Sequence, residues 1–236
     1  MTFRAIVFDL DDTLYPERAY TISGFRAVGR WAASVIGVDS SDCTDELIAL
    51  HAAGHTRDTF DRWLASRGVT DVELVREMVG VFRDHSPDIS LEHPVAELLE
   101  GLHRRYLLGL LSDGYLEVQR KKVEALALDR YLDAIVLSDE FGRDAWKPSP
   151  RPFLKVLEVL AVDAHAAVYV ADNPAKDFAG ARGVGMASVR LRSEDGVYGR
   201  LEPSAPRDAP DIEITDIGDV ERALERLGAE QTATKG

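Results

Sequence analysis

Five short runs of apolar residues recur along the chain, and polar residues follow each of them. The runs occupy residues 5–8, 106–111, 134–137, 167–171 and 186–191. Runs of this length between polar turns are typical of strands buried on both faces of a parallel sheet. Helical periodicity near 93–104, 115–128 and 218–227, and a helix start at Ser149-Pro150, alternate with them. Because alternating strands and helices form parallel sheets, the pattern predicts an α/β core flanked by helices.

Residues 16–87 follow a different pattern, with apolar residues at steps of three and four and no strong strand run. The clearest series is Phe25, Val28, Trp31, Ala32 and Val35. This periodicity predicts helices near 19–37, 43–53, 56–67 and 71–84. The segment Ser86-Pro87-Asp88 is typical of a linker returning to the main domain. We therefore predict a core of residues 1–15 and 88–236 and a small all-α domain of residues 16–87.

Composition narrows the class of protein. With 236 residues, 45% hydrophobic and 29% charged, the chain is expected to fold as an ordinary globular protein. No apolar stretch approaches the roughly 20 residues that span a bilayer, and the first residues begin a strand, so we expect no membrane insertion and a cytoplasmic location. A net charge of −13 argues against nucleic-acid binding, and the single cysteine, Cys43, excludes an internal disulfide. We expect a monomer or a homodimer.

The polar residues that follow the first four runs carry the candidate chemistry. They are Asp9 and Asp11, Ser112 and Asp113, Lys147 after a loop, and Asp172 with Asp177. Parallel strands bring their carboxyl ends to one edge of the sheet, so these groups are expected to meet there. Clustered carboxylates repel one another and need a counter-charge, for which Mg²⁺ is the usual partner of oxygen ligands. A lysine and a serine could hold phosphate oxygens, and one aspartate could act as a nucleophile.

Each of these residues taken alone has a simpler interpretation. Asp9, Asp11 and Asp12 could be turn or helix-capping residues, Ser112 could cap the helix that follows it, and Lys147 could be a solvated loop lysine. The combination in one order along the chain favours a site.

The segment Asp9-Leu10-Asp11-Asp12-Thr13, then Ser112, Lys147 and the segment 172–177, resemble the four motifs of the haloacid dehalogenase-like hydrolase superfamily. The resemblance covers the whole core in order, and its first motif is the most specific. It implies a Rossmann-like core with a helical cap inserted between the first two motifs, as in residues 16–87. In the fourth motif Ala171 stands where the family often has glycine.

The resemblance also implies roles for the aspartates. Asp9 would attack the substrate phosphorus to form an aspartyl-phosphate, and Asp11 would protonate the leaving oxygen and then activate water. Mg²⁺ would be held by the Asp9 carboxylate, the Asp11 backbone carbonyl and Asp172. Asp177 would orient the metal ligands or bind the metal.

The remaining motif residues would bind the phosphate. By the same resemblance, Ser112 and Asp113 with nearby backbone amides would hold the transferring phosphoryl group. Lys147 would neutralise charge between Asp9 and the phosphate.

The resemblance implies a Mg²⁺-dependent phosphomonoester hydrolase acting on a small soluble phosphate, such as a sugar phosphate or a nucleotide monophosphate. Dehalogenases of the superfamily lack the second aspartate of the first motif, so Asp11 favours a phosphatase. A phosphomutase shares the same chemistry and stays an alternative. A third interpretation is a non-catalytic module that binds a phosphorylated ligand or a protein. Such a module would be expected to have lost Asp9 or Lys147, and both residues are present here.

Overall fold

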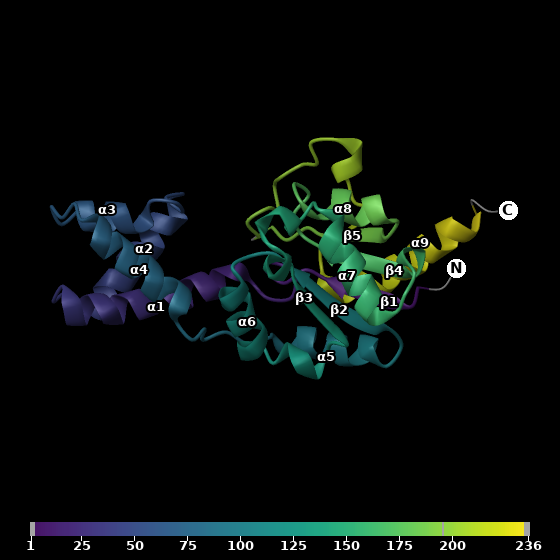
Figure 1. The fold of residues 1–236 in the computed structure, drawn as a ribbon, viewed down its shortest axis with the longest axis horizontal. Helices are drawn as coiled ribbons and strands as arrows, with labels where there is room; N and C mark the ends of the chain where they lie inside the picture. Colours follow the sequence, from purple (N-terminus) through teal and green to yellow (C-terminus); the bar gives the residue numbers. More distant parts are fainter. Residues whose placement is uncertain (1–2, 195, 234–236) are drawn as a thin grey trace. The chain divides into compact units, whose positions relative to one another are not determined.

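Residues 3–194 and 196–233 are described by a computed structural model (Figure 1). The chain divides into two compact units, one of residues Met1–Glu17 and Ser90–Gly236 and the other of residues Arg18–Ile89. Each unit has its own hydrophobic core. The predicted site residues all belong to the first unit.

The first unit is built on a six-stranded parallel sheet with the order β3-β2-β1-β4-β5-β6. This is the order of a doubly wound Rossmann-like sheet, so the predicted α/β fold class is confirmed. The strands are β1 (Ala5–Phe8), β2 (Leu107–Ser112), β3 (Ala134–Leu137), β4 (Ala167–Ala171), β5 (Ala187–Leu191) and β6 (Ile212–Ile214).

The sixth strand, β6, was not predicted from the sequence, and it pairs with β5 at one edge of the sheet. The strand has only three residues, Ile212, Glu213 and Ile214, and only the two isoleucines are buried. Two apolar residues after a long polar loop give too little periodicity to indicate a strand. The prediction of five strands was therefore incomplete.

Helices cover both faces of the sheet. Figure 1 shows α7 and α8 next to each other, and their contacts place α7 over β2 and β3 and α8 over β4 and β5. Phe153, Tyr169 and Phe178 are fully buried in the core on this side. The helices of the unit are α5 (His93–His103), α6 (Leu116–Ala125), α7 (Pro150–Leu160), α8 (Asp177–Val184) and α9 (Val220–Ala233).

The second unit is entirely helical in its described elements. Its helices are α1 (Glu17–Val35), which begins at the boundary with the first unit, α2 (Ser40–Ala52), α3 (Thr59–Ala65) and α4 (Val72–Asp84). They enclose a core that includes Phe25, Leu47, Trp63 and Met78. Asp39 caps α2 by accepting hydrogen bonds from the backbone of the first turn, which is why α2 begins three residues before its predicted start. Among the described residues, every helix is too short or too polar to cross a bilayer.

The register of the sheet places the candidate site. Phe8 of β1 lies beside Leu110 of β2 and Val170 of β4. The backbone N–H of Asp9 donates to the carbonyl of Val170 at 2.9 Å, which extends this pairing by one residue. The polar residues that follow these three strands therefore start from the same edge of the sheet.

Candidate active site

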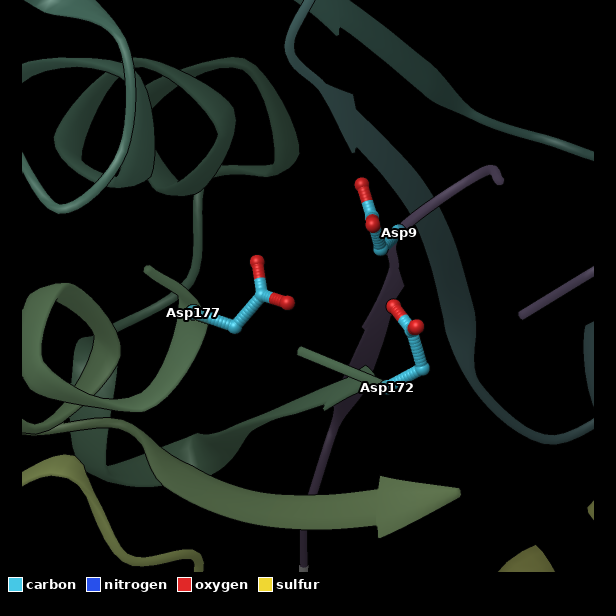
Figure 2. Close-up of side chains that lie close together, drawn as sticks. All are labelled: Asp9, Asp172 and Asp177. Carbon is cyan, nitrogen blue, oxygen red and sulfur yellow. The ribbon is translucent and has the colours of Figure 1, made fainter. Parts of the chain in front are cut away.

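Three carboxylates meet at the carboxyl edge of the sheet. Asp9 follows β1, Asp172 follows β4 and Asp177 begins α8, and Figure 2 shows their side chains close together. One oxygen from each lies within 4.8 Å of the others. All three residues are buried, so their charges have little water to screen them. Such a group needs a cation.

The Lys147 side chain supplies one positive charge. Its Nζ lies 2.7 Å from Asp9 Oδ1 and 2.7 Å from Asp177 Oδ1, and it donates to the Tyr169 hydroxyl at 2.8 Å. The lysine side chain is completely shielded from solvent. Lys147, which is 138 residues from Asp9 in the chain, therefore lies between the predicted site carboxylates of Asp9 and Asp177.

Charge pairing sets the ionisation of this group. Burial by itself would raise the pKa of Asp9, but the adjacent Lys147 ammonium lowers that pKa below its ordinary value. Burial would lower the pKa of Lys147, but Asp177 and Asp9 raise it well above the ordinary value. Asp9 is thus held as a carboxylate, the form that a nucleophile needs, and Lys147 is held as an ammonium.

Asp172 is not neutralised in the same way. Burial, followed by repulsion from Asp9 and Asp177, raises its pKa from 3.8 to about 8. Its Oδ2 is buried and accepts no hydrogen bond from the described residues. A buried oxygen without a donor, next to two further carboxylates, fits a hard divalent cation that takes oxygen ligands.

The phosphate-binding role predicted for Asp113 stays a prediction, and its contacts add a second role. Its carboxylate accepts a hydrogen bond from Ser138 Oγ at 2.6 Å and from the backbone N–H of Lys147 at 3.2 Å. Through these two contacts the Asp113 side chain holds the Lys147 loop. Its neighbour Ser112 is buried, and its hydroxyl donates to the side-chain oxygen Oε1 of Gln119 at 3.4 Å. Nothing in these contacts tests the prediction for Ser112, and it stays a prediction.

The side chains of Lys122 and Tyr15 hold Asp11, and Lys122 was not predicted to belong to the site. Lys122 Nζ of α6 lies 2.7 and 2.9 Å from the two carboxylate oxygens of Asp11. The Tyr15 hydroxyl also donates to Asp11 Oδ1. Lys122 looks like an ordinary helix lysine in the sequence. Its burial on the same face of α6 as Gln119 is apparent only in the structure.

Two further basic residues near the site were also missed. Lys176, just before α8, lies 3.9 Å from Asp113 Oδ2, and its pKa is raised by Asp9 and Asp177 against the opposing effects of burial and Lys147. Arg190 of β5 is completely buried, and its Nε donates to the backbone carbonyl of Asp172 at 3.2 Å. The Arg190 guanidinium also pairs with Glu213 of β6 at 3.1 Å, so the strand missed in the sequence helps to fix the Asp172 loop.

Asp12 has a structural role. It lies in the left-handed region with φ of 54°. Its Oδ1 accepts from the backbone N–H of Glu17 at 2.8 Å, and its Oδ2 accepts from that of Val197 at 2.9 Å. These bonds join the turn after β1 to the start of α1 and to the loop after β5.

Comparisons with known proteins agree with the resemblance. A sequence profile described as haloacid dehalogenase-like hydrolase matches residues 6–191. A glyceraldehyde 3-phosphate phosphatase of Methanopyrus kandleri is 30% identical over 234 residues, covering 94% of this chain and 98% of its own. A phosphoserine phosphatase of Thermus thermophilus is 34% identical over 196 residues, covering 82% of this chain and 75% of its own. Among solved structures, a 2-haloacid dehalogenase of Pseudomonas syringae pv. Tomato has a TM-score of 0.65 and 25% identity, and the match covers 96% of this chain and 100% of that one.

Proposed function

The chain belongs to the haloacid dehalogenase-like hydrolase family, and we propose that it is a phosphatase that hydrolyses a small soluble phosphomonoester. The observation that carries this proposal is the ion pair of Asp9 with Lys147, in which Nζ lies 2.7 Å from Oδ1. Asp172 lies next to this pair, and its carboxylate is repelled by Asp9 and Asp177. A buried, ionised carboxylate at the edge of a parallel sheet is a nucleophile that can attack phosphorus.

In the proposed reaction Asp9 attacks the phosphorus atom, the bond from phosphorus to the leaving oxygen breaks, and an aspartyl-phosphate forms. Asp11 gives a proton to the leaving oxygen and later takes one from the water that hydrolyses the aspartyl-phosphate. Lys147 offsets the negative charge that gathers between Asp9 and the phosphate. We propose Ser112 and the amides of its turn as ligands of the phosphoryl oxygens.

Mg²⁺ is the proposed cofactor. Asp9, the Asp11 backbone carbonyl and Asp172 would hold it, and Asp177 would orient this set. The buried Oδ2 of Asp172 without a donor supports this assignment. When bound, the ion would neutralise carboxylate and phosphate charge in the transition state.

The substrate class is proposed from the chemistry and from the relatives. The matched phosphatases are named for glyceraldehyde 3-phosphate and phosphoserine, which are both small phosphomonoesters. We propose a small phosphate for this chain, with sugar phosphates and nucleotide monophosphates as the first candidates. A phosphomutase would use the same residues, and product analysis with a sugar phosphate separates the two reactions.

We also propose that the helical unit of residues Arg18–Ile89 acts as a cap. It begins at Arg18, a short distance in the chain after β1 and Asp9, so it is tethered close in sequence to the nucleophile. A cap would exclude bulk water and select the leaving group.

The test is phosphate release from a panel of sugar phosphates, nucleotides, phosphoserine, glyceraldehyde 3-phosphate and p-nitrophenyl phosphate. Release is expected with Mg²⁺ and is expected to stop with EDTA. Absence of release from every member, together with failure to bind beryllofluoride and Mg²⁺ as an aspartyl-phosphate mimic, would instead support a non-catalytic protein.

Metal binding should change how stability depends on pH. The pKa of Asp172 is about 8 in the folded protein against an ordinary 3.8, so without metal this group lowers stability progressively as pH rises from about 4 to about 8. Bound Mg²⁺ offsets the repulsion among the ionised carboxylates. We therefore expect Mg²⁺ to raise the melting temperature more at pH 8 than at pH 5.

The control for this measurement is Asp172→Asn, which removes the charge and keeps the side-chain shape. In EDTA the variant should be more stable than wild type at pH 8, and Mg²⁺ should hardly change its melting temperature. An equal Mg²⁺ effect at both pH values, or an undiminished effect in the variant, would show that Asp172 does not hold the metal.

A further inference from the structure

The residue that carries this inference is Lys122, on the inner face of α6. Its side chain is only 3% exposed, and its Nζ contacts both carboxylate oxygens of Asp11, at 2.7 and 2.9 Å. The Tyr15 hydroxyl donates to one of the same oxygens. The Asp11 side chain is therefore held in one orientation by contacts at both of its oxygens.

Such an ion pair has no evident stabilising purpose. Removing two charges from water costs about as much as their attraction returns, so buried ion pairs rarely add net stability. What a pair of short contacts at both oxygens does provide is a fixed direction for the carboxylate. A fixed direction matters for Asp11 because a proton transfers only across a short, aligned contact.

The same face of α6 reaches the other side of the site. Gln119, one turn before Lys122, is buried, and its side-chain Nε2 donates to Asp11 Oδ2 at 3.4 Å. Its side-chain oxygen Oε1 accepts from Ser112 Oγ at 3.4 Å. One turn of α6 thus spans from Asp11 to the turn proposed to bind the phosphoryl group.

We propose that Lys122 is a positioning residue that aims the Asp11 carboxyl group at the leaving oxygen. The proposal rests on the proposed phosphatase function. In the step concerned, the bond from Asp9 to phosphorus forms and the bond to the leaving oxygen breaks. That oxygen takes a proton from the Asp11 carboxyl group, which enters the step protonated and leaves it as the carboxylate that Lys122 contacts. Lys122 does not touch the reacting atoms and acts only through Asp11.

Leaving groups of different quality separate this role from a structural one. An alkyl phosphate expels a strongly basic oxygen and needs the proton, whereas p-nitrophenyl phosphate expels a stable anion and does not. The ratio kcat/KM reports only steps up to the first irreversible one, so it isolates loss of the leaving group. We would measure it for p-nitrophenyl phosphate and for the best alkyl phosphate of the panel.

Lys122→Met should lower kcat/KM for the alkyl phosphate by about 10- to 100-fold, which is part of what a general acid contributes. The loss for p-nitrophenyl phosphate should stay within roughly threefold, because that reaction does not need the proton. Lys155→Met is the matched control, since Lys155 pairs with Glu158 at 3.1 Å on the surface of α7 and should leave both ratios unchanged. In an Asp11→Asn background, Lys122→Met should cause little further loss.

Equal losses for both substrates, or an unchanged or faster alkyl reaction, would overturn the proposal. If Lys122→Met does not fold, Lys122→Arg keeps the charge but displaces the contact, and it should show the same selective loss to a smaller degree. A wild-type protein that releases no phosphate from either substrate would refute the phosphatase function and this inference with it. If the wild type turns over both substrates and the Lys122 variants lose no more kcat/KM for the alkyl phosphate than for p-nitrophenyl phosphate, this inference alone would be refuted.

Discussion

Asp9→Asn is expected to leave the protein folded and to abolish turnover. An amide has the shape of the carboxylate but is a very poor nucleophile, so the aspartyl-phosphate cannot form. Loss of a nucleophile that works with its partners as a unit typically lowers kcat by roughly 10⁴-fold or more. The measurement is phosphate release with the best substrate of the panel and Mg²⁺.

Stability should change little in this variant. Lys147 loses one anionic partner but keeps Asp177 at 2.7 Å, and Asp172 loses its strongest repelling neighbour. These effects oppose each other, so we expect a melting temperature in EDTA close to that of wild type. Asp163→Asn, at an exposed position before β4, is the matched control and should keep full activity. Appreciable turnover by folded Asp9→Asn would remove Asp9 from the role of nucleophile.

The sequence was most informative where a strand ends in a polar residue. A parallel sheet brings such ends together whatever their separation in the chain, which is why Asp9 and Asp172 could be expected to meet. Lys147 is 138 residues from Asp9, and its place between Asp9 and Asp177 depends on the loop that Asp113 holds. Pattern alone indicated that Lys147 follows a strand and precedes a helix, but not which way its side chain points.

The residues that were missed share a physical reason. Lys122 and Arg190 are charged residues in a helix and a strand, and sequence reasoning assigns such residues to solvent because burying an unpaired charge is costly. They are buried here because each has partners from elsewhere in the chain, Asp11 for Lys122 and Glu213 for Arg190. Pairing between distant residues leaves no local pattern. The direction of the Asp113 carboxylate, toward the Lys147 backbone, is likewise set by tertiary contacts.

Lys147→Ala should reduce both activity and stability. Loss of the ammonium removes charge compensation from the transition state, and comparable electrostatic groups contribute on the order of 2–4 kcal/mol to it, a loss of about 30- to 1,000-fold in kcat/KM. In the folded protein the change leaves Asp9 and Asp177 buried without their shared cation, and breaking a buried pair in this way costs about 3–5 kcal/mol. Activity is measured by phosphate release, and stability by urea unfolding in EDTA.

The loss of stability should depend on pH in a defined direction. Without Lys147, burial and mutual repulsion raise the pKa values of Asp9 and Asp177 above those of the unfolded chain. The two carboxyl groups lower the free energy of unfolding only when they are ionised, so this loss grows as pH rises. The difference in the free energy of unfolding between variant and wild type should therefore be larger at pH 8 than at pH 5. Lys155→Ala is the control and should match wild type at both pH values.

A second substitution separates the two effects. Adding Asp177→Asn to Lys147→Ala removes one of the two unpaired charges, so part of the lost stability should return at pH 8. Activity should stay low, because the ammonium beside Asp9 is still missing. If stability and activity instead recovered together, the low activity of Lys147→Ala would reflect a disturbed fold, and Lys147 would have no separate role in the reaction.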